Sequence, residues 1–292
     1  MRIAVTGASG FIGRRLCEVV RERGHEVITL GRSFGDRLWD PMTRSAPLDG
    51  TDAVVHLTGE PIAEGRWTRA KMDRIRDSRV IGTKNLVTGI RNARPQVLVC
   101  ASAIGYYGSR GDEELTEESL PGDDFLAGVC REWEAEATAS GVRTVCVRTG
   151  IVLGPNGALS KMVTPFKLGL GGRLGNGRQW MSWIHRDDLV DLYLHAIEKD
   201  DLAGPILGTS PNPVTNLEFT KALGRVLGRW TLLPMPHWQL RALFGKVADV
   251  LVGSQRCRPK RTLESGFAFK YPDLEAALRQ VLENDAAERR PA

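Results

Sequence analysis

The chain has 292 residues, of which 42% are hydrophobic and 26% charged, and its formal net charge is +5. This composition excludes a disordered chain and is sufficient for the core of one enzyme-sized unit with a smaller lobe. The basic residues are spread along the chain and interleaved with acidic ones, so we expect a small anionic ligand and no nucleic acid as partner.

The first predicted elements are an apolar strand over residues 2–6, a glycine-rich turn and an amphipathic helix. Gly7 permits the tight turn, Gly10 presents no Cβ to a pyrophosphate, and Gly13 lets the helix pack close to the strand. Phosphates would then lie on free N–H groups at the helix N-terminus. A second strand over 24–30 completes a βαβ unit, so the pattern predicts a dinucleotide site and not merely a structural turn.

The end of the second strand indicates which dinucleotide is bound. Gly31, Arg32 and Ser33 stand where an Asp or Glu would bind the ribose 2′-hydroxyl of NAD. An arginine can pair with a 2′-phosphate, whereas a carboxylate would repel it. The sequence therefore predicts NADP(H), and the alternative for Arg32 is a solvated loop arginine.

Strands and helices continue to alternate up to residue 154. The hydrophobic pattern predicts three further strands, over 52–58, 96–101 and 142–148. Helices are expected between them, over 68–92 and 123–140. This alternation predicts an α/β fold with a doubly wound parallel (Rossmann) sheet, in which the strand ends line one ligand crevice.

The character of the sequence changes after residue 154. Residues 169–177 form a glycine-rich loop, and the later predicted helices are separated by proline-containing connections. These helices are expected over 217–227, 237–252 and 273–282. We therefore expect an NADP-binding domain over 1–154 and, over 155–292, mostly a smaller C-terminal substrate lobe.

Cysteine usage and the lack of targeting signals indicate the compartment. The chain has five cysteines without CxxC spacing, and no metal site is expected from them: Cys17, Cys100, Cys130, Cys146 and Cys257. They are predicted to be reduced packing residues. No signal peptide precedes the first strand and no apolar run reaches membrane-spanning length, so we expect a cytoplasmic protein with no membrane partner.

Four motifs at ordered positions carry a family resemblance: Gly59–Ile62, Arg76–Thr83, Ser102–Gly108 and Trp183–Leu189. At these residues the chain resembles the extended short-chain dehydrogenase/reductase superfamily. Within it, the chain is similar to the atypical NADP-binding group called "epimerase family" or NAD-dependent epimerase/dehydratase-like. The resemblance covers nearly the whole chain and includes the group's own C-terminal module, from about residue 237.

The resemblance implies an NADP(H)-binding oxidoreductase or nucleotide-sugar epimerase with a small-molecule substrate, which is unknown, acting as a monomer or a homodimer. It also implies a set of cofactor-binding residues: Gly7, Gly10, Phe11, Ile12, Gly13, Gly31, Arg32, Ser33, Leu57, Thr58, Arg74, Arg79 and Ile151. Leu57 and Thr58 would flank the adenine or ribose, and Ile151 would approach the nicotinamide. For Arg74 and Arg79 the alternative is a solvated helix face.

The chain departs from the superfamily at its catalytic pair. Active members use a Tyr-x-x-x-Lys pair one helical turn apart, in which the lysine lowers the tyrosine pKa. The corresponding positions in this chain are Leu126 and Cys130. The second hypothesis is therefore a non-catalytic NADP(H)-binding sensor or regulatory protein.

Three residues after the strand over 96–101 are the substitute catalytic candidates: Ser102, Tyr106 and Tyr107. Ser102 either replaces the usual serine, whose position holds Ala103, or caps a turn. A tyrosine here either transfers a proton or packs on the cofactor.

Two further side chains, Cys130 and His185, are each open to two interpretations, and a third, His56, to one. Cys130 is either a nucleophile or a packed helix cysteine. His185 either contacts a substrate or caps the helix that begins near Asp187, and His56 is interpreted as a satisfied core histidine.

Overall fold

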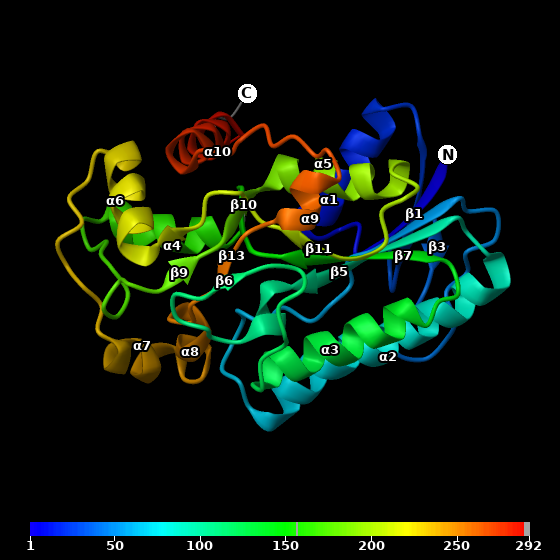
Figure 1. Cartoon of the computed structure of the whole chain (residues 1–292), viewed down its shortest axis with the longest axis horizontal. Coiled ribbons are helices and arrows are strands. Elements are labelled where there is room, and N and C mark those ends of the chain that lie inside the picture. The colour runs from blue at the N-terminus through cyan, green and yellow to red at the C-terminus, as the bar shows by residue number, and fades with distance from the viewer. Residues whose placement is uncertain (156, 289–292) are drawn as a thin grey trace.

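The computed structural model describes residues 1–155 and 157–288, and its centre is a seven-stranded sheet (Figure 1). All neighbouring strands pair in parallel, in the order β11-β7-β5-β4-β1-β2-β3. The strands are β1 (Arg2–Thr6), β2 (Glu26–Gly31), β3 (Arg37–Leu38), β4 (Ala53–His56), β5 (Val97–Ala103), β7 (Arg143–Thr149) and β11 (Gly204–Gly208). The predicted doubly wound parallel sheet is confirmed.

Helices cover both faces of this sheet (Figure 1). The helices α1 (Phe11–Glu22) and α5 (Arg186–Glu198) lie on one face, and α2 (Arg69–Ala93) and α3 (Phe125–Thr138) lie on the other. Alternation along β1 explains both cores, because successive side chains point to opposite faces. Ile3 and Val5 join the cluster that contains α1 and α5, whereas Ala4 joins the cluster under α2 and α3.

The strand order places the predicted cofactor turn at the switch point of the sheet. β1 pairs with β2 on one side and with β4 on the other, so the crossovers leave β1 in opposite directions. Ligands of open α/β sheets bind in the crevice outside the carboxyl ends of the strands at such a point.

A second part of the chain lies beyond the carboxyl ends of the strands. It contains α4 (Ala158–Lys167), α6 (Asn216–Leu227) and α10 (Leu274–Glu288), with short strands between them. These strands are β8 (Ile151–Leu153), β9 (Trp180–Met181), β10 (Trp183–His185) and β12 (Val214–Thr215). Trp183, Phe219 and Leu278 are buried in a core of their own.

The chain crosses between the two parts more than once. Although α5 and β11 follow residue 154, α5 covers the central sheet and β11 pairs with β7 as its edge strand. A short parallel pair then joins β6 (Glu114–Leu115) to β13 (Arg256–Cys257), which precedes α9 (Lys260–Glu264). The second part is therefore not one continuous segment.

The single helix expected over 237–252 is wrong. The structure has two helices there, α7 (His237–Phe244) and α8 (Val247–Leu251). Gly245 ends α7 with a φ of +59°. This left-handed conformation cannot continue a right-handed helix, and glycine adopts it at little cost.

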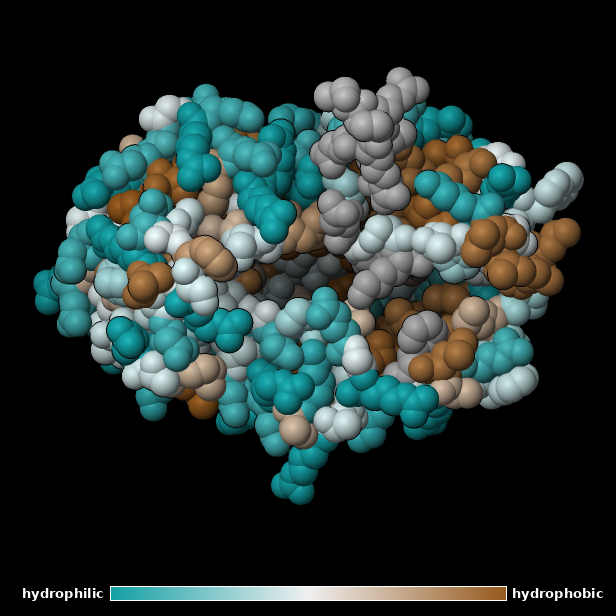
Figure 2. All heavy atoms as spheres, turned by 180° about the vertical axis from the view of Figure 1, so that it is seen from behind, coloured by the Kyte–Doolittle hydropathy of each residue, from teal (hydrophilic) through white to brown (hydrophobic). Residues whose placement is uncertain are grey.

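The face opposite to that of Figure 1 is hollowed in its middle (Figure 2). Hydrophobic atoms gather at the side of this view that carries the second part of the chain. Exposed hydrophobic side chains cluster in sequence around the start of α7: Trp230, Leu232, Leu233, Trp238 and Leu243.

Candidate cofactor site and active site

The turn between β1 and α1 brings backbone atoms unusually close together. Gly7 has a φ of +69°, and a Cβ on Gly13 would lie 2.2 Å from the carbonyl oxygen of Gly7. Helix α1 begins at Phe11, with Gly10 as its N-cap and no acidic residue in the first turn. Its first N–H groups therefore have no side-chain acceptor from the cap or first turn and can bind an anion.

Leu57 and Thr58, predicted to flank the adenine or ribose, follow β4 and lie on the other side of this turn. A Cβ on Gly7 would lie 3.0–3.1 Å from the backbone of these two residues. The Leu57 N–H donates to the carbonyl oxygen of Thr6 at 3.3 Å. Leu57 and Thr58 are thus positioned at the crevice by their contact with the glycine turn.

His56 is a satisfied core histidine, as predicted. It is fully buried, and its Nδ1 and Nε2 atoms lie 2.7 Å and 3.1 Å from the hydroxyls of Thr6 and Thr83. Burial, with a smaller contribution from Arg79, lowers the pKa of His56 to about 3. His56 is therefore a neutral structural residue below the turn.

The end of β2 presents Arg32 and Ser33 to solvent, next to Gly31. Within residues 1–155 and 157–288, the Arg32 guanidinium has no hydrogen bond or ion pair. The nearby carboxylate of Asp36 is turned back onto β2, where it accepts from the Thr29 N–H and hydroxyl at 2.8 Å each. These bonds lower the pKa of Asp36. Arg32 is therefore available for an external anion.

Arg79 holds the loop that follows β4. Its Nη1 donates to the carbonyl oxygens of Glu60 at 3.1 Å and Ile75 at 3.0 Å. The guanidinium also lies 5.1 Å from the ring centroid of Trp133, and burial lowers its pKa. Arg79 thus lies between α2 and α3, not on a solvated helix face.

A charged cluster that sequence reasoning missed lies beside Arg79. The buried Lys71 places its Nζ 2.8 Å from Glu60 Oε1, and the exposed Arg74 places its Nε 3.4 Å from the same oxygen. The bond to Lys71 is the main reason why the pKa of Glu60 is lowered. Cofactor contacts by Arg74 and Arg79 remain predictions.

The candidate residue Ser102 belongs to a buried polar network. Arg148 on β7 makes two parallel hydrogen bonds to Glu134 on α3, from Nε at 2.9 Å and from Nη2 at 2.8 Å. The Ser102 hydroxyl donates to the same carboxylate at 2.6 Å. Ser102 and Arg148 are directly paired in the register of β5 and β7. Glu134 and Arg148 carry no motif of their own in the sequence.

Both candidate tyrosines contact Arg148, from the 3-10 turn η1 (Ile104–Tyr107). Arg148 Nη1 donates to the Tyr107 hydroxyl at 2.9 Å, and its guanidinium lies 3.4 Å from the centre of the Tyr106 ring. Burial raises the pKa of Tyr107, which is fully enclosed. Tyr106 is half-buried, and its hydroxyl has no hydrogen bond within the described part of the chain. Tyr106 is thus the less constrained of the two.

Arg148 remains charged at this buried position. Burial alone would lower its pKa, but the hydrogen bonds to Glu134 and the nearby Tyr107 raise the pKa above the ordinary arginine value. A charged bidentate pair fixes the positions of the groups around it. Ser102, Tyr106 and Tyr107 are therefore brought together by Arg148 and Glu134.

Leu126 and Cys130 lie on α3 beside this network. A Cβ on Gly105 would lie 3.4 Å from the Leu126 Cβ, so Leu126 packs against η1. Cys130 is buried, and burial raises the pKa of its thiol to about 12. The thiol is therefore protonated at neutral pH, which supports the packed-cysteine interpretation.

Ile151 and Phe11 lie where the two parts of the chain meet. Ile151 begins β8, and its N–H donates to the carbonyl oxygen of Ser182 at 2.8 Å. A Cβ on Gly154 would lie 2.8 Å from the Phe11 ring, and the Arg186 guanidinium lies 5.6 Å from the centre of that ring. The first residue of α1 is therefore in contact with the second part.

His185 caps helix α5, and only 2% of the residue is exposed. Its Nδ1 accepts from the Asp187 N–H at 3.1 Å, so Nε2 carries the proton and donates to Gln280 Oε1 at 2.7 Å. The ring also packs against Tyr271, with centroids 4.0 Å apart. Both ring nitrogens are used, which supports the capping alternative over a substrate contact.

Two further observations concern only the residues that the structure describes. Among them, no cluster of three or more His, Cys, Asp or Glu side chains is arranged to hold a metal ion. None of the described helices combines the length and apolarity that a membrane span requires.

The parallel sheet and the glycine turn at its switch point define a protein of the Rossmann, dinucleotide-binding class. The chain belongs to the NAD dependent epimerase/dehydratase family, whose sequence profile matches residues 3–206. A second profile, a domain of unknown function named DUF1731, matches residues 235–281. The resemblance seen in the motifs is confirmed, including its separate C-terminal module.

Named relatives are similar over nearly the whole chain. The chloroplastic epimerase family protein SDR39U1 homolog of Arabidopsis thaliana is 41% identical, covering 97% of this chain and 87% of the relative. Epimerase family protein YfhF of Bacillus subtilis is 38% identical, covering 97% and 98%. The crystal structure of human epimerase family protein SDR39U1 (isoform 2) with NADPH superposes with a TM-score of 0.91 at 37% identity, covering 97% and 100%.

More distant solved structures share the fold. A UDP-galactose 4-epimerase structure superposes with a TM-score of 0.78 at 22% identity, covering 99% of this chain and all of that one. At this identity the likeness concerns the architecture of the sheet and its helices alone.

Proposed function

We propose that this protein binds NADP(H) at the β1–α1 turn and acts as an oxidoreductase or epimerase on a small carbonyl or hydroxyl compound. The observation that carries the proposal is the pairing of two features at one crevice. The first N–H groups of α1, which follow Gly10, have no side-chain cap. Arg32, which has no hydrogen bond or ion pair among the described residues, follows β2. The first accepts a pyrophosphate and the second a 2′-phosphate.

The residues present fit a dinucleotide. Gly7, Gly10 and Gly13 leave the backbone exposed where side chains would block a phosphate, and the Gly13 position has no room for a Cβ. The NADPH in the human relative's structure supports the choice of cofactor. When bound, the nicotinamide would supply hydride transfer, and the chain's own residues would bind, orient and protonate the substrate.

The Arg148–Glu134 pair assigns different tasks to the three catalytic candidates. The Ser102 proton is directed at Glu134, and Tyr107 is held by Arg148 below the site. The Tyr106 ring lies against the fixed Arg148 guanidinium, and within the described residues its hydroxyl has no hydrogen bond, so this hydroxyl is free to contact a substrate. We therefore assign proton transfer to Tyr106 and a positioning role to Tyr107 and Ser102.

The first test measures the binding of NADPH and of NADH to the unsubstituted protein and to the Arg32→Ala variant. Because a charge-assisted hydrogen bond contributes about 1.5–3 kcal/mol, Arg32→Ala should weaken NADPH roughly ten- to hundredfold and leave NADH almost unchanged. Tryptophan quenching or calorimetry measures both affinities. Arg229→Ala, which removes another exposed arginine, is the matched control and should change neither. If neither cofactor binds, the glycine turn is structural and the proposal fails.

A non-catalytic NADP(H)-binding sensor is the second candidate. It is favoured by Leu126 and Cys130 at the positions where active relatives are expected to carry a tyrosine and a lysine, and by the buried thiol of Cys130. NADPH consumption with a carbonyl or sugar-nucleotide compound, lost in Tyr106→Phe, would support the enzyme. Tight NADPH binding without turnover, together with altered protease cleavage in the 169–177 loop, would support the sensor.

The five cysteines support the expected reducing compartment. All five are free and buried. Unpaired cysteines in this number are usual in proteins of the cytoplasm, so a cytoplasmic location is part of the proposal.

A further inference from the structure

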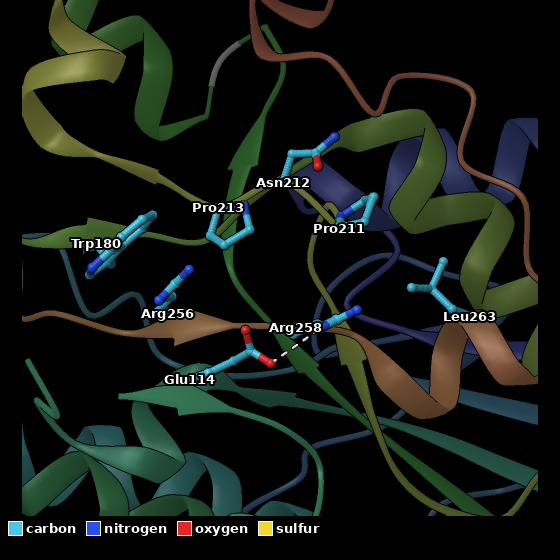
Figure 3. Close-up of a pocket in the computed structure, with 8 residues that line it drawn as sticks. All are labelled: Glu114, Trp180, Pro211, Asn212, Pro213, Arg256, Arg258 and Leu263. Atoms are coloured by element: carbon cyan, nitrogen blue, oxygen red, sulfur yellow. Dashed lines mark hydrogen bonds and ion pairs between the residues drawn. The ribbon is translucent and has the colours of Figure 1, made fainter. Parts of the chain in front are cut away.

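A second hollow, of about 450 Å³, lies next to the β6–β13 pair (Figure 3). Trp180 of β9, Arg256 of β13 and Arg258 line it together with the loop after β11, from Pro211 to Pro213. Its volume lies within the range of small-molecule sites.

This hollow is separate from the proposed cofactor site. It lies beside β11, the edge strand of the sheet, whereas the cofactor turn follows β1, and the strands β7, β5 and β4 lie between them. None of the predicted cofactor residues lines it. The hollow therefore needs an explanation of its own.

The alternation of side chains along a β-strand places Arg256 and Arg258 on the side of this hollow. Cys257 is buried in a core with Tyr107 and Leu115, so its neighbours Arg256 and Arg258 point to the opposite side. Figure 3 shows the Arg256 side chain beside Trp180 and pointing toward Pro213, and the Arg258 side chain next to Glu114. Two guanidinium groups therefore line the same hollow.

The hydrogen-bonding capacity of Arg256 is unused. The side chain is half-buried and its guanidinium lies 4.5 Å from the centre of the Trp180 ring. Within the described ranges 1–155 and 157–288 it has no hydrogen bond or ion pair. Within the same ranges, the side chain of Arg258, 63% exposed, makes only a long contact of 3.4 Å with Glu114. Arginine forks bind phosphate and carboxylate groups bidentately, so an anion fits here.

Part of the remaining wall is flat and apolar. Trp180 is fixed by a hydrogen bond from its Nε1 to Asp112 Oδ1 at 2.9 Å, so the indole orientation is set before anything binds. Pro211, Pro213 and Leu263 add apolar surface, and the polar residues Asn212 and Glu114 complete the lining (Figure 3). Rigid aromatic and proline rings favour a planar group over a flexible polar one.

We propose that this hollow binds a small anion carried on a planar ring. Its phosphate or carboxylate group lies against Arg256 and Arg258, and its ring lies against Trp180. Arg256 and Leu263 belong to the segment that matches the C-terminal module, and Glu114 belongs to the segment that matches the epimerase family. A ligand here would therefore contact both.

In the experiment, 1-naphthyl phosphate is titrated into protein saturated with NADPH, and calorimetry measures its affinity. It should bind at least tenfold more tightly than 1-naphthol, which lacks the charge, and than inorganic phosphate, which lacks the ring. A parallel titration with 1-naphthoate distinguishes the two anion sources, and the tighter of the two ligands identifies the preferred group.

Substitutions in the lining test whether 1-naphthyl phosphate binds in this hollow. Arg256→Gln should weaken 1-naphthyl phosphate at least tenfold, and Trp180→Leu should weaken it while leaving inorganic phosphate unchanged. Arg229→Gln is the matched control and should have no effect. Circular dichroism spectra that match the unsubstituted protein establish that each variant is folded.

Two results would overturn the proposal. Equal affinity for 1-naphthol and 1-naphthyl phosphate would make the hollow a merely apolar surface. An unchanged affinity in Arg256→Gln, or a loss in Arg32→Ala instead, would place the anion elsewhere. If NADPH itself does not bind, the titrations are made without it. The comparison with Arg256→Gln then still tests whether the anion binds in this hollow. The proposed cofactor site and the proposed anion site can therefore fail independently of each other.

Discussion

At the scale of single residues, His56 shows how burial fixes a protonation state. Both ring nitrogens are bonded to the hydroxyls of Thr6 and Thr83, and the ring has no contact with solvent. Its folded-state pKa of about 3 lies far below the value of about 6.5 that an unfolded chain would give. Between about pH 3 and pH 6.5, His56 is therefore protonated in the unfolded state and neutral in the folded state.

This difference predicts a loss of stability in mild acid. The contribution of His56 is fully present above about pH 6.5 and is lost as the pH falls toward 3, by roughly 1.4 kcal/mol per pH unit. Urea unfolding at pH 7, 6 and 5 should show a smaller pH dependence in His56→Asn than in the unsubstituted protein. His237→Asn, at an exposed position, should keep the full dependence. Parallel curves for the protein and His56→Asn would contradict the prediction.

Some site residues could be predicted from the sequence and others could not. Gly7 and Gly13 could be assigned because a tight turn and a close backbone approach each require glycine at a fixed spacing. The pair of Glu134 and Arg148 could not, because its contact exists only once α3 packs on β7. The unpaired state of Arg256 likewise depends on strands that are far apart in the sequence.

At the scale of elements, long periodic segments were predictable and short ones were not. The strands β1, β2, β4, β5 and β7 and the helices α1, α2, α3 and α6 occur where the pattern predicts them. The strands β8 to β12 were missed because most have only two or three residues, too few to establish an alternation. The break between α7 and α8 depends on one glycine, which a helical pattern tolerates.

His185 provides a test at this scale, because it connects α5 to α10. His185→Ala should lower the free energy of unfolding by about 2 kcal/mol, from the lost N-cap and the lost bond to Gln280. His185→Asn should recover roughly half of this, because asparagine is a good N-cap but cannot reach Gln280. Both variants should retain NADPH affinity. Chemical denaturation measures the first effect, and equal stability of all three proteins would exclude the capping role.

At the scale of the whole molecule, the two parts meet at the first residue of α1. Phe11 packs against Gly154 and lies near Arg186, while the turn that begins α1 is the proposed cofactor site. Binding at that turn is therefore expected to stabilise both parts together.

NADPH should accordingly raise the unfolding temperature in a single transition. At a free concentration about 100-fold above Kd, binding adds about 2.7 kcal/mol, which corresponds to a shift of roughly 5 °C or more for a chain of this size. Thermal unfolding followed by tryptophan fluorescence reports on the second part through Trp183, which is fully buried in that part's own core. Two separate transitions, of which NADPH shifts only one, would show that the parts unfold independently.

The return of β11 to the central sheet has a consequence for how the chain folds. The edge of β7 stays open until residues 204–208 have been made and have passed back across the second part. An unpaired strand edge is a template for association with other chains, and a parallel pairing over this sequence distance forms slowly. During synthesis the nascent sheet is therefore exposed to aggregation until well over half of the chain has been translated, and a fragment cut at residue 154 would keep that open edge permanently.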